Sequence, residues 1–189
     1  MKTAVYSGSF NPLHTGHLAI MKYLLEEAGF DMVYLIVSPK NPLKDGISSA
    51  SGQERYQAAI QAVGRHFTAD SAGKVKVDDI EMNMPEPHYT IRTLDALRER
   101  EPGNEFTFIM GADNLADIRR WKDYRRILKE YGTAVYPREG TDLKAVLDDL
   151  KAEDSSFMIQ ILEAPIVNIS STEIREGISA GRDMSMWLM

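Results

Sequence analysis

Cysteine is absent from the sequence of 189 residues. Disulfide bonds, thiolate metal ligands and a cysteine nucleophile are therefore excluded, which agrees with a reducing compartment. Basic side chains are also in the minority, since 22 Lys and Arg stand against 28 Asp and Glu and the net charge is −6. Nucleic acids and anionic membranes bind clustered basic residues. We therefore expect neither a nucleic acid nor a membrane as a partner.

The sequence also has no apolar run that approaches the roughly 20 residues needed to cross a bilayer. Its first residues, MKTAVYSGSF, lack the basic region and the long apolar stretch of a secretory signal. We therefore expect a cytoplasmic protein. With 43% apolar side chains the chain can form a core, and its length is typical of one compact domain, which we expect to span residues 1–189.

Segments with strand-like and helix-like patterns alternate along the chain. Short apolar segments bounded by Gly, Pro or Ser predict strands at residues 2–7, 32–38, 74–80, 105–110, 133–136 and 157–162. Helical spacing predicts helices at residues 17–28, 51–66, 90–100, 121–131 and 141–151, and a last helix after Ser171. Ser51 and Glu54 form a capping box, and Thr141 is the predicted cap of its helix. This alternation predicts an α/β fold with a doubly wound, mostly parallel sheet of the Rossmann-like type.

The segment GSFNPLHTGH, residues 8–17, directly follows the first predicted strand. Ligands of open α/β sheets bind beyond the carboxyl ends of the strands. His14 and His17 are three residues apart, so a helix that begins near Leu13 would place them on one face of its first turn. Unpaired N–H groups attract anions there, and Gly16 lets a phosphate approach the backbone. The segment therefore predicts a phosphate site.

Two other interpretations of these histidines stay open at this point. One is a glycine-rich turn that carries two surface histidines. The other is a zinc site, which is weaker because no cysteine can contribute and His66 and His88 lie in unrelated contexts.

A second motif, ISSTEIR, occupies residues 169–175 and opens the last predicted helix. Hydroxyl groups at a helix start are common caps, so a purely structural role is one interpretation. In the other, Ser170, Ser171 and Thr172 form a second phosphate cradle with the free N–H groups. Arg175, one turn further on, would supply a planar guanidinium for the same anion. Two cradles at two helix starts fit a chain of three phosphates.

A third motif, MGADNL, occupies residues 110–115 at the end of the fourth predicted strand. Gly111 would let a base or ribose lie against the backbone, and Asp113 could accept hydrogen bonds from ribose hydroxyls. A helix-capping role for Asp113 is the competing interpretation. Trp121 could stack on a heteroaromatic ligand, although simple packing of a lone tryptophan is more common.

These motifs carry a resemblance to known proteins. GSFNPLHTGH resembles the signature of the HIGH-type nucleotidyltransferases, and ISSTEIR resembles the phosphate-binding segment that this superfamily carries near its C-terminus. GADNL followed by Trp121, together with HYTIRTL at residues 88–94, is similar to bacterial nicotinate-nucleotide adenylyltransferases. The similarity extends from Tyr6 to Arg175.

The resemblance implies a role for each matching residue. The catalytic pair would be His14 and His17, which bind the phosphates of ATP. The other ATP-binding residues would be Gly8, Ser9, Phe10, Gly16, Gly111, Asp113, Ser170, Ser171, Thr172 and Arg175. The acceptor would be bound by Asn11, Lys44, Tyr89, Thr90 and Trp121. The last three of these would hold its pyridine ring, and no residue is assigned as a metal ligand.

The sequence departs from the family pattern at two places. Leu43 stands where many members have a histidine, so Lys44 is left as the cation that faces the acceptor phosphate, with Lys40 as a candidate to compensate. The sequence also ends at Met189, sooner after the last helix than is usual in the family. Arg138 follows a predicted strand but receives no role from the sequence.

The implied reaction transfers AMP from ATP to nicotinate mononucleotide, giving nicotinate adenine dinucleotide and pyrophosphate for NAD biosynthesis. The 5′-phosphate oxygen of the acceptor attacks the α-phosphorus of ATP. A phosphate monoester has a second pKa near 6, so this oxygen is already ionised at pH 7 and needs no general base. Mg²⁺ is expected to arrive with ATP, because the sequence shows no dedicated carboxylate cage.

Three alternatives remain at this stage. Nicotinamide mononucleotide or phosphopantetheine could be the acceptor, and a non-catalytic nucleotide-binding regulator could use the same fold. A homo-oligomer is also left open.

Overall fold

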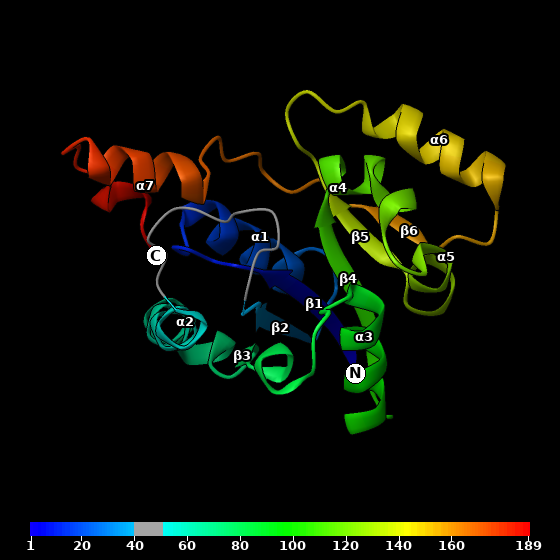
Figure 1. The fold of residues 1–189 in the computed structure, drawn as a ribbon, viewed down its shortest axis with the longest axis horizontal. Coiled ribbons are helices and arrows are strands. Elements are labelled where there is room, and N and C mark those ends of the chain that lie inside the picture. The colour runs from blue at the N-terminus through cyan, green and yellow to red at the C-terminus, as the bar shows by residue number, and fades with distance from the viewer. Residues whose placement is uncertain (40–50) are drawn as a thin grey trace.

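The computed structural model describes residues 1–39 and 51–189. A parallel sheet of six strands, in the order β3-β2-β1-β4-β5-β6, runs through the molecule (Figure 1). The strands are β1 (Lys2–Gly8), β2 (Met32–Val37), β3 (Val75–Asp78), β4 (Glu105–Gly111), β5 (Thr133–Tyr136) and β6 (Ile159–Ile161). The strand order reverses direction between β1 and β4, which is where ligands bind in doubly wound sheets.

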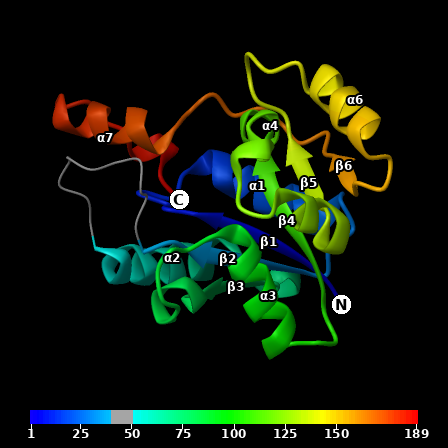
Figure 2. The same cartoon turned by 45° about the vertical axis from the view of Figure 1, so that its right-hand side comes forward.

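Helices cover both faces of this sheet (Figure 2). The α-helices are α1 (Thr15–Glu26), α2 (Gly52–His66), α3 (Thr90–Arg100), α4 (Ala112–Ala116), α5 (Tyr124–Arg126), α6 (Leu143–Glu153) and α7 (Ser171–Ser179). Short 3-10 segments lie at Ala69–Ser71, Ile80–Asn83, Ile118–Arg120 and Ser185–Trp187, and a π-helical turn lies at Ile127–Tyr131. The predicted α/β, doubly wound fold is confirmed. Among the described residues, no helix is long and apolar enough to cross a membrane.

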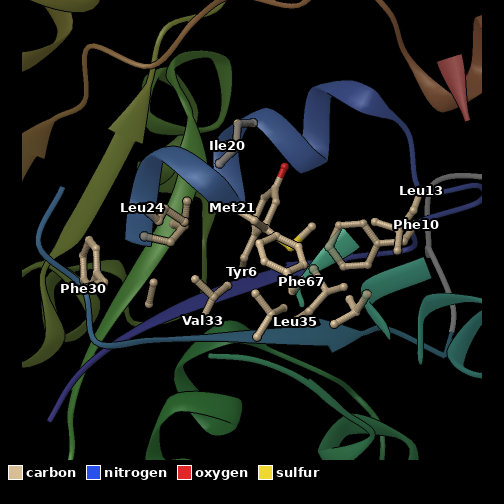
Figure 3. Close-up of a cluster of buried hydrophobic side chains, with 14 of the residues drawn as sticks. Tyr6, Phe10, Leu13, Ile20, Met21, Leu24, Phe30, Val33, Leu35 and Phe67 are labelled. Carbon is tan, nitrogen blue, oxygen red and sulfur yellow. The ribbon is translucent and has the colours of Figure 1, made fainter. Parts of the chain in front are cut away.

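Two apolar cores hold the helices to the sheet. Alternate strand residues point to opposite faces, so Tyr6 of β1 faces the core under α1 and α2, whereas Val5 faces the core under α3, α4 and α6. Figure 3 shows the first of these cores, where Met21 and Leu24 of α1 pack over Leu35 of β2. Because both faces of the sheet are buried, the sequences of the strands are nearly continuous apolar runs.

Several predicted boundaries agree with the structure, and two local predictions are wrong. The capping box of Ser51 and Glu54 is present at the start of α2. The predicted cap Thr141 does not cap α6. Instead Asp142 does so, because its carboxylate accepts from the N–H of Ala145 at 3.0 Å. The predicted helix at residues 121–131 starts late, at Tyr124, because Asp123 adopts a left-handed conformation with φ 52° before α5 begins.

Helix α7 lies beyond the carboxyl edge of the sheet, beside the start of α1 (Figures 1 and 2). Ser171 Oγ donates to the carbonyl of Pro12 at 2.9 Å. The guanidinium of Arg175 donates to the carbonyl of Asn11 at 2.5 Å. The second sequence motif is therefore bonded to the first, across more than 150 residues of chain.

Candidate active site

His14 and His17 together form the N-terminal cap of helix α1. Nδ1 of His14 accepts from the N–H of Gly16 at 3.1 Å, and Nδ1 of His17 accepts from the N–H of His14 at 3.2 Å. The two imidazoles stack with their centroids 3.7 Å apart. The helix begins at Thr15, so His14 is the cap itself and not, as expected, a residue of the first turn. The pair nevertheless shares one end of the helix.

These hydrogen bonds fix the tautomer of both rings. A ring nitrogen that accepts carries no proton, so the proton of each neutral imidazole sits on Nε2. Burial, helped by the charge of Arg138, lowers the pKa of His14 to about 4. Burial and the neighbouring His14 hold the pKa of His17 well below its usual range. At neutral pH both histidines are therefore neutral donors at the start of a helix, where the backbone already favours anions.

Two glycines of the first motif make room for aromatic rings. A Cβ on Gly16 would lie 3.0 Å from Nδ1 of His14, and a Cβ on Gly8 would lie 3.1 Å from the ring of Phe10. Phe10 has a φ of 44°, which is uncommon for a non-glycine residue. Figure 3 shows its ring within the apolar core, and the ring of His17 meets it edge-on at 5.1 Å. Phe10 therefore supports the histidine pair from the core side.

The start of α7 forms the second predicted cradle. Ser170 is the N-cap, and its hydroxyl accepts from the N–H of Glu173 at 3.2 Å and donates to the Glu173 carboxylate at 2.7 Å. The guanidinium of Arg175 also donates to Thr172 Oγ1 at 3.2 Å. Ser171 and Arg175 thus hold α7 against the loop of the first motif, and Thr172 helps to orient Arg175.

A cavity of about 360 Å³ lies where these elements meet. His14, His17 and Gly16 line it from α1, Ser170 lines it from the start of α7, and Asp113 lines it from α4. The rest of the wall is formed by residues 165–169, by residues 136–139 at and after the end of β5, and by Tyr6, Ile20 and Glu173. The cavity thus sits at the reversal of strand order between β1 and β4. It joins residues from all three sequence motifs.

Several predicted ATP-binding residues lie beside this cavity and do not line it. They are Gly8, Ser9, Phe10, Gly111, Ser171, Thr172 and Arg175. Gly111 is needed by its neighbours, because a Cβ there would lie 2.5 Å from a carboxylate oxygen of Asp113. Asp113 does not cap α4: the N-cap is Gly111, and Asp113 lies within the first turn. The ligand-binding roles of these residues stay predictions.

Arg138 is the main cavity residue to which the sequence analysis gave no role. Its guanidinium lies 3.7 Å from the carboxylate of Asp113 and 5.5 Å from the ring centre of Tyr136. Tyr136 in turn lies against Tyr6, and burial raises the pKa of Tyr6 well above its usual range. The one signal for Arg138 was its position just after β5, at the carboxyl edge of the sheet.

Asn11, Tyr89, Thr90 and Trp121, the predicted acceptor-binding residues that the structure describes, lie outside this cavity. Tyr89 is exposed and is the N-cap of α3, which begins at Thr90. Trp121 is half-buried, with its ring edge-on to Phe108 at 5.8 Å. Its packing role is therefore real, and stacking on a ligand stays a prediction.

Asn11 joins the two predicted cradles through its carbonyl, which accepts from Arg175. Lys40, Leu43 and Lys44 lie outside the described residues. Within residues 1–39 and 51–189, no group of three or more His, Asp or Glu side chains is arranged to hold a metal ion. The described residues of this arrangement therefore offer donors for an anion.

Comparisons with known proteins agree with this arrangement. A cytidylyltransferase-like family model matches residues 5–177. A protein of Flavobacterium johnsoniae named "Probable nicotinate-nucleotide adenylyltransferase" is 38% identical over 184 residues, which cover 97% of this chain and 90% of that protein. A protein of the same name from Porphyromonas gingivalis is 37% identical, with 100% of this chain and 89% of that protein covered.

Solved structures show the same fold. The structure of Plasmodium falciparum nicotinic acid mononucleotide adenylyltransferase complexed with NaAD has a TM-score of 0.78 at 18% identity, and covers 97% of this chain and 87% of its own. At this identity the likeness shows the fold, whereas the bacterial relatives are similar enough to show the family. The chain belongs to the nicotinate-nucleotide adenylyltransferases, within the cytidylyltransferase-like family.

Proposed function

We propose that this chain transfers AMP from ATP to nicotinate mononucleotide, giving nicotinate adenine dinucleotide and pyrophosphate in NAD biosynthesis. One observation carries the proposal beyond family membership: the histidine pair of α1 and the N-cap of α7 line one cavity at the reversal of strand order. A triphosphate needs several donors from different directions, and two helix starts provide them. A protein without a nucleotide ligand would have no need for this convergence.

ATP is proposed to occupy the cavity. Its phosphates would lie near Nε2 of His14 and His17, at the start of α1. Asp113 would accept from the ribose hydroxyls, since it lines the cavity at the end of β4. The apolar residues Ile166 and Val167, which also line the cavity, are suited to contact a base. Arg138 would move from Asp113 toward the anion, because their separation of 3.7 Å marks a loose ion pair.

The acceptor is proposed to bind on the other side of the His14 loop. Tyr89 and Thr90 start α3, and Trp121 leaves part of its ring exposed while the rest packs on Phe108. Support for the assignment comes from the family membership and from this exposure. Asn11 and Lys44 complete the proposed set.

The chemistry requires positioning and charge stabilisation by the protein. The acceptor phosphate is ionised at pH 7, so the protein needs to place its oxygen in line with the α-phosphorus and to offset the repulsion between two anions. Neutral Nε2 donors, the N–H groups of α1 and α7, and nearby guanidinium groups would do this. Mg²⁺ is proposed to enter with ATP as part of the substrate, where it would neutralise charge on the phosphate oxygens.

Pyrophosphate release from ATP, measured in parallel with three acceptors, tests the proposal. We expect release with nicotinate mononucleotide at a kcat/KM well above that with nicotinamide mononucleotide or phosphopantetheine. A higher rate with either of the other two would reassign the acceptor. No pyrophosphate release with any of the three acceptors, together with measurable ATP binding, would favour a nucleotide-binding regulator. The cytoplasmic location, the homo-oligomer and the single domain over residues 1–189 stay predictions.

A further inference from the structure

Two charged side chains outside the cavity are buried at the carboxyl edge of the sheet. Arg55 of α2 is 7% exposed, and Glu81 of the 3-10 segment Ile80–Asn83 is 4% exposed. Burying a charge is costly unless hydrogen bonds compensate it. Neither residue belongs to the three sequence motifs. Their hydrogen-bond partners show where they act.

The guanidinium of Arg55 joins two loops of backbone. Its Nη1 donates to the carbonyl of Ser9 at 2.5 Å and to that of Ser38 at 2.8 Å, and its Nη2 donates to the carbonyl of Pro39 at 2.8 Å. Ser9 follows β1 and belongs to the first motif, whereas Ser38 and Pro39 follow β2. A planar guanidinium can hold several carbonyls at fixed angles, which an ammonium group cannot do. Arg55 therefore fixes the spacing of the two loops.

The carboxylate of Glu81 extends this connection to helix α3. Its Oε2 accepts from Ser38 Oγ at 2.6 Å, and its Oε1 accepts from Thr93 Oγ1 at 2.8 Å. Thr93 lies one turn after Tyr89 and Thr90. Glu81 thus ties the segment after β2 to the helix start that carries the predicted pyridine-binding residues.

We propose that Arg55 and Glu81 are positioning residues for the acceptor half of the active site. Together they hold three segments in register: the loop that leads to Asn11, residues 38 and 39 after β2, and the start of α3. The inference rests on the proposed function, because it assumes that these segments bind the acceptor. Neither side chain needs to touch the substrate.

The effect should fall on the acceptor more than on ATP. Of the residues held by these bonds, only Ser9 is assigned to ATP by the resemblance, and neither it nor Ser38, Pro39 or Thr93 lines the cavity proposed for ATP. A displacement of about 1 Å at a distance from the reacting atoms can lower a rate roughly 10²-fold. Loosening the acceptor side should therefore raise the KM for the acceptor and lower kcat, while the KM for ATP changes little.

The test compares Arg55→Lys, Arg55→Ala and Glu81→Gln with the control Arg65→Ala. Arg65 lies on the same helix but is exposed, and it donates to a backbone carboxylate oxygen of Met189. We expect kcat/KM for nicotinate mononucleotide to fall by roughly 10- to 100-fold in the Arg55 variants. The fall should be smaller in Glu81→Gln, which keeps the shape of the side chain. The KM for ATP should stay within about 3-fold, and Arg65→Ala should behave as wild type.

A second measurement covers the case in which Arg55→Ala folds poorly. Guanidinium ion at a concentration too low to denature should restore part of the rate in this variant and none in Arg65→Ala. Arg55→Lys and Glu81→Gln retain side-chain volume and give the KM comparison independently.

Equal changes in the KM for the acceptor and the KM for ATP, or no change in either, would overturn the inference. The proposed function would still stand as long as the wild-type protein is active. A wild-type chain that is inactive with nicotinate mononucleotide would overturn the proposed function, and the inference with it.

Discussion

The N–H of His14 donates to Nδ1 of His17, so the two histidines of the first motif hold each other at the start of α1. The N–H of Gly16 completes the arrangement by donating to Nδ1 of His14. Each imidazole is oriented by the backbone that it caps, before any ligand is present. Donors that are fixed in advance need little reorganisation when charge develops on a phosphate. The structural cap and the proposed phosphate site thus use the same two side chains, the cap through Nδ1 and the proposed site through Nε2.

Replacement of His17 by alanine is expected to lower turnover by roughly 10²-fold, the usual effect of removing one preorganised donor. The helix should still form, because loss of one capping interaction costs only about 1 kcal/mol. Steady-state rates and circular dichroism check both parts. His66→Ala at the far end of α2 is the control. Wild-type turnover in His17→Ala would refute the role of His17.

Gly16→Ala tests the packing of the histidine pair. The new Cβ would lie 3.0 Å from the His14 ring, which must shift by a few tenths of an ångström and strain its bond to the backbone. We expect turnover to fall by about 10-fold or more as the donor is misplaced. Gly64→Ala in α2 is the matched control, since nothing lies within 4 Å of its new Cβ. That variant should keep its activity and gain roughly 0.5–1 kcal/mol of stability. Equal activity of the two variants would contradict the packing argument.

Trp121→Ala is expected to weaken acceptor binding more than ATP binding, because the proposed stacking partner is the pyridine ring. The variant should also lose stability, since the indole packs on Phe108. Separate titrations with nicotinate mononucleotide and with an ATP analogue measure the two affinities. Trp187→Ala removes the other tryptophan and serves as the control. Equal loss of both affinities in Trp121→Ala would indicate general damage.

Stability should depend on pH through His14. Its pKa is about 4 in the folded chain and near 6.5 in the unfolded chain. The unfolded chain therefore takes up the proton first as the pH falls. The stability associated with neutral His14 is fully present above pH 6.5 and is lost as the pH approaches 4. We would measure the free energy of unfolding by urea at several pH values between 6.5 and 5. This free energy should change less with pH in His14→Asn than in wild type.

A direct titration of His14 tests the influence of Arg138, whose charge helps to lower the pKa of His14. In Arg138→Gln this pKa should rise, which NMR titration of the His14 ring would measure. Arg182→Gln, at an exposed position, is the control. An unchanged pKa in Arg138→Gln would show that burial alone accounts for the shift.

Local patterns in the sequence predicted most of the fold, because each depends on residues close together in the chain. The helix over residues 90–100 and the capping box of Ser51 have the predicted positions. The helix predicted over residues 121–131 begins only at Tyr124, after the left-handed Asp123, and continues as a π-helical turn to Tyr131. Arg126 bonds to both Asp95 of α3 and Glu130, which fixes the segment after a left-handed residue.

The candidate site was only partly predictable. His14, His17 and Ser170 were identified by their motifs. That these motifs lie close together in the fold was implied by the resemblance, because their positions in the sequence do not show it. Arg138 was missed because its place in the cavity depends on β5 lying next to β4. A local sequence pattern does not reveal the order of the strands in the sheet. Arg55 was missed because a buried arginine on a helix looks like a surface residue in sequence.

A crystal structure with a non-hydrolysable ATP analogue would test most directly whether one polyphosphate spans the starts of α1 and α7. We predict phosphate oxygens at about 3 Å from Nε2 of His14 or His17, with the terminal phosphates at the N-terminal turn of α7. An analogue whose phosphates lie away from both helix starts would contradict the account.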